Sequence, residues 1–163
     1  MVIDHERAAV YAAELAAFDG TDLESVIALD DVDAAVSAVV TGPWWTGPHV
    51  VLRRARSDAR SSSTRCGPAG DPATITIAAD QTTIATAAHE LAHVLAGPVA
   101  GHNGSFRAAY LDVIAAITNR DSVGRRMDIH IRQLATAFSD AGLSVGPRGW
   151  HPPPTSMAGP IAL

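Results

Sequence analysis

The sequence predicts an α+β fold, in which helices precede and follow a small sheet. Three observations predict it: helical spacing of apolar residues before residue 41, two strand-like segments between residues 49 and 79, and three further helical patterns up to residue 140. The length of 163 residues fits one domain with a modest core. We expect that domain over residues 1–146, and a proline-rich, extended or disordered tail over residues 147–163.

Two helices are predicted before the sheet. The first spans residues 4–18 and ends at Gly20, with one face formed by Arg7, Tyr11, Leu15 and Phe18 and with Val10 beside them. The second spans residues 31–40, where the valines follow i, i+4, i+7, i+8 spacing: Val32, Val36, Val39 and Val40.

Two strands are predicted over residues 49–54 and 73–79. In the second, Ile75 and Ile77 alternate with Thr74 and Thr76, which is typical of a half-buried strand. The segment between them, residues 56–65, is rich in serine and arginine, so we expect a mobile loop there.

Three helices are predicted after the sheet. The first spans residues 82–96 and ends at Gly97-Pro98. The second spans residues 104–119, with an apolar stripe of Phe106, Tyr110, Val113 and Ile117. The third spans residues 124–140, with a stripe of Met127, Ile131, Leu134 and Phe138.

Composition limits the partners and the location. The net charge is −5, which disfavours a nucleic-acid partner because phosphate binding normally needs a basic surface. Cys66 is the single cysteine, so the chain has no internal disulfide and no thiolate cage for structural zinc. No apolar run is long enough to cross a membrane, and the first residues do not resemble a signal peptide. We therefore expect a cytoplasmic protein that does not contact membranes.

The chemical signal is the segment His89-Glu90-Leu91-Ala92-His93 within a predicted helix. Histidines four residues apart lie on one helix face, one turn apart, where both imidazoles can reach a single metal ion. Glu90 is then placed to accept a proton from water beside that metal rather than to bind it. Two helical histidines with a third ligand favour Zn²⁺.

A catalytic zinc site needs a third protein ligand. No glutamate follows Glu90, so the ligand must come from the histidines and aspartates further along the chain: His102, Asp112, Asp121, Asp128, His130, Asp140 and His151. His102 is favoured because the short loop after Gly97 can return the chain to the metal, and Gly101 and Gly104 give that loop freedom. Asp112 is the alternative third ligand. If His102 is the ligand, Asp112 is instead either a hydrogen-bond partner of a ligand or a solvated surface residue. His130 and His151 are expected at the surface.

Hydrolysis of an acyl bond also needs a donor for the oxygen that becomes negatively charged. Tyr110, Arg107 and His130 are the candidates. Tyr110 belongs to an apolar stripe, which favours core packing for it.

The segment 89–93, the short loop and His102-Asn103-Gly104-Ser105-Phe106-Arg107 together resemble the zincin segment of SprT-like metallopeptidases. Small metallohydrolases of actinobacteria and their phages are similar, including a first helix of the type Arg7-Ala8-Ala9-Val10-Tyr11. The resemblance implies a minimal zincin-like fold, with a small mixed sheet packed against the helix that carries His89 and His93, here called the motif helix. It implies that His89, His93 and His102 bind Zn²⁺, that Glu90 is the catalytic base and that Phe106 packs under the loop.

The resemblance also implies that Thr74–Ala79 is an edge strand along which an extended peptide binds. Asn103 departs from the family pattern, which has glycine there. The favoured function is a zinc metallopeptidase acting on a peptide or protein substrate. The alternatives are another zinc hydrolase, such as an amidase or a nuclease, and a non-catalytic module that binds zinc or a partner. The sequence does not fix the oligomeric state.

Overall fold

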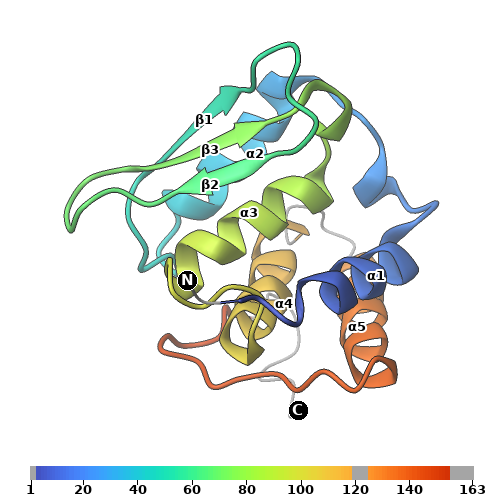
Figure 1. The fold of residues 1–163 in the computed structure, drawn as a ribbon. Helices are drawn as coiled ribbons and strands as arrows, with labels where there is room; N and C mark the ends of the chain where they lie inside the picture. The colour runs from blue at the N-terminus through green and yellow to red at the C-terminus, as the bar shows by residue number, and fades with distance from the viewer. Residues whose placement is uncertain (1–2, 119–124, 155–163) are drawn as a thin grey trace.

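The computed structural model describes residues 3–118 and 125–154, and the side chains of these residues except 125–128. These residues form five α-helices and a three-stranded mixed sheet, which confirms the α+β class. Figure 1 shows the sheet at one end of the molecule and α3 directly beside it. The elements are α1 (Arg7–Phe18), η1 (Asp22–Glu24), α2 (Leu29–Val40), β1 (Val50–Arg54), β2 (Ser63–Arg65), β3 (Ala73–Ile77), η2 (Ala79–Gln81), α3 (Ile84–Ala96), α4 (Gly104–Thr118) and α5 (Arg125–Asp140).

The strand order in the sheet is β1-β3-β2. β3 runs parallel to β1, with Val50 opposite Ala73, and antiparallel to β2, with Thr64 opposite Ile75. The expectation that the strand before the motif helix is an edge strand is therefore wrong, because β3 has a partner on each side. β2 has a partner on one side only among the described residues.

β2 lies within residues 56–65, so the prediction of a mobile loop is wrong for part of that segment. The strand is short and polar, and its sequence carries no apolar alternation. Side-chain bonds hold it in place: the Ser62 backbone N–H donates to Gln81 Oε1 over 2.8 Å, and the Ala78 N–H donates to Ser62 Oγ over 3.0 Å. A strand held by such long-range bonds leaves no signal in local composition.

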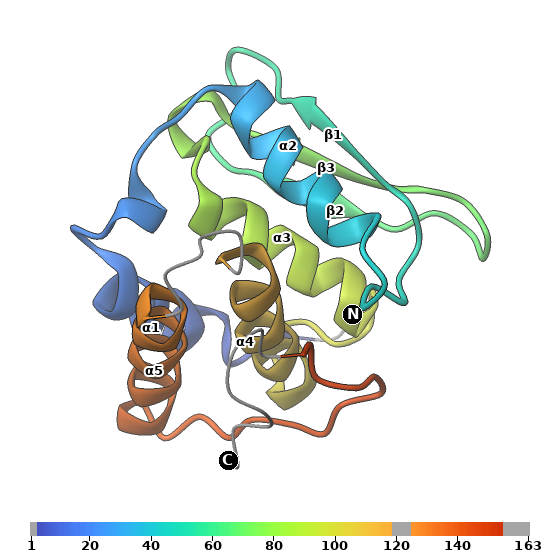
Figure 2. The same cartoon turned by 180° about the vertical axis from the view of Figure 1, so that it is seen from behind.

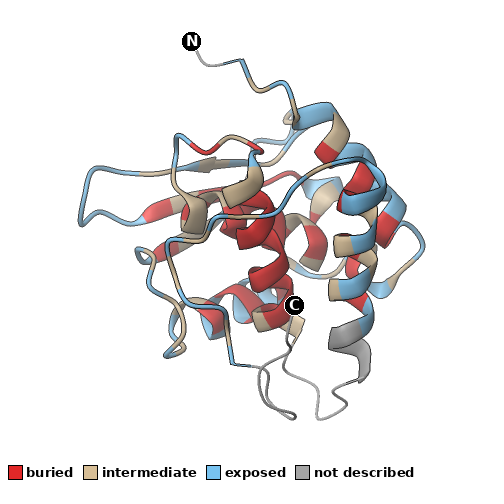
Figure 3. Cartoon of the chain, turned by 90° about the horizontal axis from the view of Figure 1, so that it is seen from below, coloured by how far each residue is buried: buried red, intermediate tan, exposed pale blue. Residues whose placement is uncertain are grey.

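The core lies between the sheet and the central helices. Ala73, Ile75 and Ile77 of β3 are fully buried, while Thr74 and Thr76 are half-buried, as the alternation predicts. Figure 3 shows the buried residues concentrated in the middle of the molecule. Figures 1 and 2 show that α2 lies along the sheet beside α3, while α1, α4 and α5 lie on the other side of α3.

α1 buries a different face from the one the sequence suggested. Its buried residues are Val10, Ala13, Glu14, Ala17 and Phe18. Tyr11 and Leu15 are instead 43% and 61% exposed. The reason is that the small alanines of α1 pack towards α5, which lies alongside it in both views (Figures 1 and 2). The helix also begins at Arg7 rather than at residue 4.

The remaining apolar stripes are as predicted where they can be checked. In α2, Val32, Val36 and Val39 are buried, and Val40 is half-buried. All four stripe residues of α4 are buried, and so are Leu134 and Phe138 of α5. Met127 lies outside the described side chains. None of the described helices has the length and apolar character needed to cross a bilayer.

Residues 147–154 form no helix or strand, but they pack against the domain. Arg148 and Trp150 bind Asp112, and the Trp44 indole N–H donates to the backbone carbonyl of His151 over 2.7 Å. A Cβ on Gly104 would lie 2.2 Å from the carbonyl oxygen of Gly146. Gly104 is therefore needed for close approach of this segment rather than for backbone freedom. The rest of the predicted tail, residues 155–163, lies outside the described residues.

Candidate metal centre

α3 carries the first two histidines towards the middle of the domain. The helix begins after Thr83, whose hydroxyl oxygen accepts from the backbone N–H of Thr86 over 3.1 Å. Its apolar residues anchor it between the sheet and α4, so that His89 is 4% exposed. One turn along the helix, the ring of His93 lies with its centroid 5.0 Å from that of His89. The spacing of four residues thus places both imidazoles on one face of α3, as the sequence predicts.

The loop after α3 brings the third histidine to the same place. Gly97 ends the helix with φ of 92°, and Gly101 turns the chain with φ of 54°. A side chain at Gly101 would also approach the carboxylate of Asp4 to 3.2 Å. Glycine therefore suits this position because of its positive φ, and a larger residue would also require the Asp4 side chain to shift slightly. Asn103 does not adopt a positive φ; its side-chain oxygen accepts from the Phe106 N–H over 3.1 Å and caps α4.

The ligand atoms of His89, His93 and His102 lie within 4.8 Å of one another, so these three side chains could hold one metal ion. The two Nε2 atoms of His89 and His102 are 3.3 Å apart. Two nitrogens bound at about 2.0–2.1 Å to one tetrahedral zinc would be about 3.3 Å apart. The all-histidine donor set suits the ion that the sequence suggests, and the His89–His102 pair has the spacing of two ligands of one ion.

Carboxylates orient two of the three rings. Glu14 Oε2 lies 3.1 Å from Nδ1 of His89, and Asp4 Oδ2 is hydrogen-bonded to Nδ1 of His102. A carboxylate that accepts from Nδ1–H leaves the lone pair of Nε2 free, so each ring presents Nε2 to the cluster. In Figures 1 and 2 the coloured segment that precedes α1 passes beside the loop that follows α3, in agreement with the hydrogen bond between Asp4 and His102.

Glu14 is in turn held by Tyr110. The Tyr110 hydroxyl donates to Glu14 Oε1 over 2.5 Å and lies 3.2 Å from the carbonyl oxygen of Ala85. Tyr110 is fully buried, and burial followed by the charge of Glu14 raises its pKa well above the ordinary value. The phenol therefore stays a hydrogen-bond donor, and its role is to position Glu14 rather than to stabilise an oxyanion.

The environment favours neutral rings at two of the three positions. Burial, followed by the charges of His89 and His102, lowers the pKa of His93 to about 3. Burial also lowers the pKa of His102, although the hydrogen bond with Asp4 opposes it. At His89 burial acts in the same direction, but the hydrogen bond and charge of Glu14 outweigh it and raise the pKa. Metal binding needs the neutral imidazole, which these pKa values provide near neutral pH at His93 and His102.

Glu90 is 7% exposed and is oriented from β2. The Thr64 hydroxyl lies 2.5 Å from Glu90 Oε2 and 3.1 Å from the Glu90 backbone oxygen. Burial raises the pKa of Glu90, and the Thr64 hydrogen bond and the charge of His89 oppose that rise. The carboxylate thus interacts with the charge of His89 and has a raised proton affinity, as suits a group that accepts a proton and later returns it.

Other residues that the sequence proposed serve different roles. Asp112 is buried and accepts from Arg148 Nε over 2.7 Å and from the Trp150 indole over 2.8 Å, so it is neither a surface residue nor part of the cluster. The guanidinium of Arg107 is buried and donates to the backbone oxygens of His102 and Ser144 and to Glu6. Arg107 therefore fixes the loop that carries His102.

His130 contradicts the expectation of a surface residue. It is 7% exposed, packs edge-on against Phe18 at 6.2 Å between ring centroids, and lies 3.3 Å from an oxygen of Asp22. His151 is exposed, as expected. Asp140 is exposed on α5, and Asp121 and Asp128 lie outside the described side chains. The Asp4, Glu14 and Thr64 contacts with the cluster and with Glu90 are the functional features that sequence reasoning missed.

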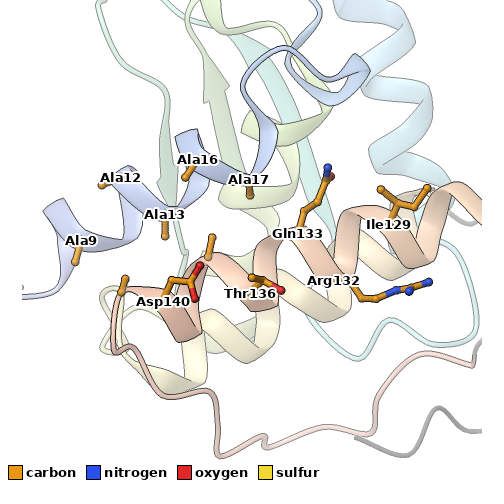
Figure 4. Close-up of a pocket in the computed structure, with 12 residues that line it drawn as sticks. Ala9, Ala12, Ala13, Ala16, Ala17, Ile129, Arg132, Gln133, Thr136 and Asp140 are labelled. Carbon is orange, nitrogen blue, oxygen red and sulfur yellow. The ribbon is translucent and has the colours of Figure 1, made fainter.

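A surface groove of about 880 Å³ lies between α1 and α5, away from this cluster. Figure 4 shows alanines of α1 facing Gln133, Thr136 and Asp140 of α5. None of the three histidines lines the groove. Its lining consists mostly of small apolar side chains, with Arg132, Gln133, Thr136 and Asp140 as the polar residues.

No family model, no curated protein and no solved structure matches this chain. The interpretation of the candidate metal centre therefore depends on its own geometry.

Proposed function

We propose that this chain is a zinc-dependent hydrolase that cleaves peptide bonds. The observation that carries the proposal is the convergence of His89, His93 and His102, with the Glu90 carboxylate on the next residue of the same helix. When bound, Zn²⁺ would polarise a substrate carbonyl and lower the pKa of water at the site to about 7. We also propose that the chain is related to SprT-like metallopeptidases and that it acts in the cytoplasm.

Each residue of the candidate site has a role in this scheme. The three histidines hold the metal through Nε2, and Glu14 and Asp4 keep two of them in the required tautomer. Glu90 accepts a proton from the attacking water at its carboxylate and delivers it to the leaving nitrogen. Thr64 holds one oxygen of that carboxylate through the hydrogen bond that its hydroxyl donates.

The sheet supports a peptide as the substrate. Among the described residues β2 has one neighbour, so its other edge can pair with an extended chain. Thr64 belongs to β2 and contacts Glu90, so a peptide paired with β2 would pass beside the proton acceptor. Backbone pairing of this kind selects extended segments and makes small demands on their side chains.

The test is cleavage of a defined peptide pool by the zinc-loaded chain, read by mass spectrometry. Glu90→Gln keeps the size of the side chain and should reduce cleavage by about 10²–10⁴-fold, because it removes the proton acceptor. Asp33→Asn is the control, since Asp33 is exposed on α2 and the loss of its charge should leave cleavage intact. If the wild type cleaves nothing, or if Glu90→Gln cleaves as well as the wild type, the proposed function is wrong.

A further inference from the structure

One side of the histidine cluster is covered by an exposed tyrosine of α1. The Tyr11 ring stacks on the ring of His89, with 5.4 Å between centroids and 7° between planes. It also lies 5.4 Å from the ring of His102, at a tilt of 56°. Tyr11 is nevertheless 43% exposed. The side chain thus borders the site and faces solvent at the same time.

A positive charge lies beside this tyrosine. Arg7 precedes Tyr11 by one helical turn, and its guanidinium carbon is 5.5 Å from the centroid of the Tyr11 ring. Burial is the largest influence on the pKa of each of the three histidines, and the Arg7 charge is a smaller one that lowers all three. The guanidinium is therefore close enough to act on the whole cluster while it remains exposed.

Arg7 and Tyr11 could donate hydrogen bonds to a substrate oxygen, which the buried Tyr110 and Arg107 cannot do. The Tyr110 hydroxyl is bonded to Glu14, and the guanidinium of Arg107 is bonded to backbone oxygens. A phenol and a guanidinium are both hydrogen-bond donors, and the latter is always charged. Donors fixed beside a reacting carbonyl stabilise the negative charge that develops on its oxygen.

We propose that Arg7 and Tyr11 form an anion-binding subsite at the candidate metal centre, which receives the oxygen that becomes negatively charged when water adds to an acyl substrate. The subsite donates hydrogen bonds and exchanges no proton or electron with the substrate. Its ligands are carboxylate-like and hydroxamate-like groups that reach the metal at the same time. This inference rests on the proposed function, whose own test is the Glu90→Gln comparison.

The subsite can be tested without knowing the substrate. The probe is acetohydroxamate, a small oxyanion that binds zinc, and its affinity for the zinc-loaded full chain is measured by titration calorimetry. Tyr11→Phe keeps the ring that stacks on His89 but removes the hydroxyl, and Arg7→Met keeps a long side chain but removes the charge. Each variant should bind the probe about tenfold more weakly, which corresponds to one charge-assisted hydrogen bond. Zinc affinity, measured in parallel with a chelating dye, should stay within about threefold of the wild type, because Phe keeps the ring on His89 and the charge of an exposed arginine acts only weakly through solvent.

Arg56→Met is the matched control, because the Arg56 side chain is 89% exposed in the segment between β1 and β2 and should not affect the probe. The subsite is overturned if Tyr11→Phe and Arg7→Met bind acetohydroxamate as the wild type does. It is also overturned if zinc affinity falls by the same factor as probe affinity, because the residues would then only position His89. A wild type that binds zinc and the probe but cleaves no peptide would contradict the proposed function and leave the subsite supported.

Discussion

Glu14 Oε2 lies 3.1 Å from Nδ1 of His89, although 75 residues separate them in the chain. The same carboxylate accepts the Tyr110 hydroxyl through its other oxygen, so α1, α3 and α4 meet at one buried acid. A charged group buried in this way is tolerated because both oxygens have partners. The arrangement ties the orientation of a candidate metal ligand to the packing of three helices.

Glu14→Gln should weaken zinc binding by about 10–100-fold. The amide keeps the shape of the side chain but cannot hold the His89 ring in its Nδ1–H form as a carboxylate does. The measurement is zinc affinity by competition with a chelating dye. Asp33→Asn, at an exposed position of α2, is again the control and should match the wild type. Unchanged zinc affinity in Glu14→Gln, with the fold intact by circular dichroism, would remove Glu14 from the site.

Zinc should stabilise the chain through His102. At a free zinc concentration 100 times the dissociation constant, binding adds about 2.7 kcal/mol to the free energy of unfolding. For a chain of this size that corresponds to a rise in Tm of roughly 5–11 °C. His102→Ala should lose this rise, whereas His151→Ala should keep it because His151 is exposed outside the cluster. A full thermal shift in His102→Ala would assign the third ligand elsewhere.

Zinc affinity should decrease in acid because of His89. The pKa of His89 is raised above 6.5, so the metal-free chain takes up a proton there as the pH falls through that raised value. Zinc must displace this proton, so the association constant should fall about tenfold or more per pH unit below the raised pKa, with His102 adding to the slope where the pH reaches its own lowered pKa, and should level off above the pKa of His89. His93, with a pKa of about 3, adds no competing proton in this range. Affinities measured from about pH 5 to pH 8 check the slope, and a flat profile would contradict it.

Asp112→Asn should destabilise the fold and leave zinc binding intact. Asp112 accepts two hydrogen bonds from Arg148 and one from Trp150, and its side chain is 7% exposed. Loss of the charge should lower the free energy of unfolding by about 2 kcal/mol, measured by urea denaturation. The variant should still bind zinc with the affinity of the wild type. Loss of zinc without loss of stability would restore Asp112 as a ligand.

Local pattern predicts the parts of this protein that depend on neighbours in sequence. The helix of His89 and His93, the glycine that ends it and the loop that returns His102 all follow from spacing within residues 82–104. The apolar stripes of α2 and α4 follow from the same periodicity. Each of these features is set by backbone geometry over one or a few helical turns.

The missed features depend on contacts between distant segments. Asp4 meets His102 across 98 residues, and Thr64 meets Glu90 across 26. One local signal was present for Glu14, which is the acidic residue on the face that Val10 and Phe18 bury. An acid at an apolar position indicates a buried partner, and here the partners are His89 and Tyr110. The sequence predicts the wrong face of α1 because alanines occur on both its buried and its exposed sides, and so do not indicate which side is buried.

The central claim is that three imidazoles hold one ion, and anomalous diffraction at the zinc edge from crystals grown with zinc tests it most directly. We predict one strong anomalous peak per chain, about 2.0–2.1 Å from Nε2 of His89, His93 and His102. A chain without a peak between these rings, or with zinc held by other side chains, would contradict the account.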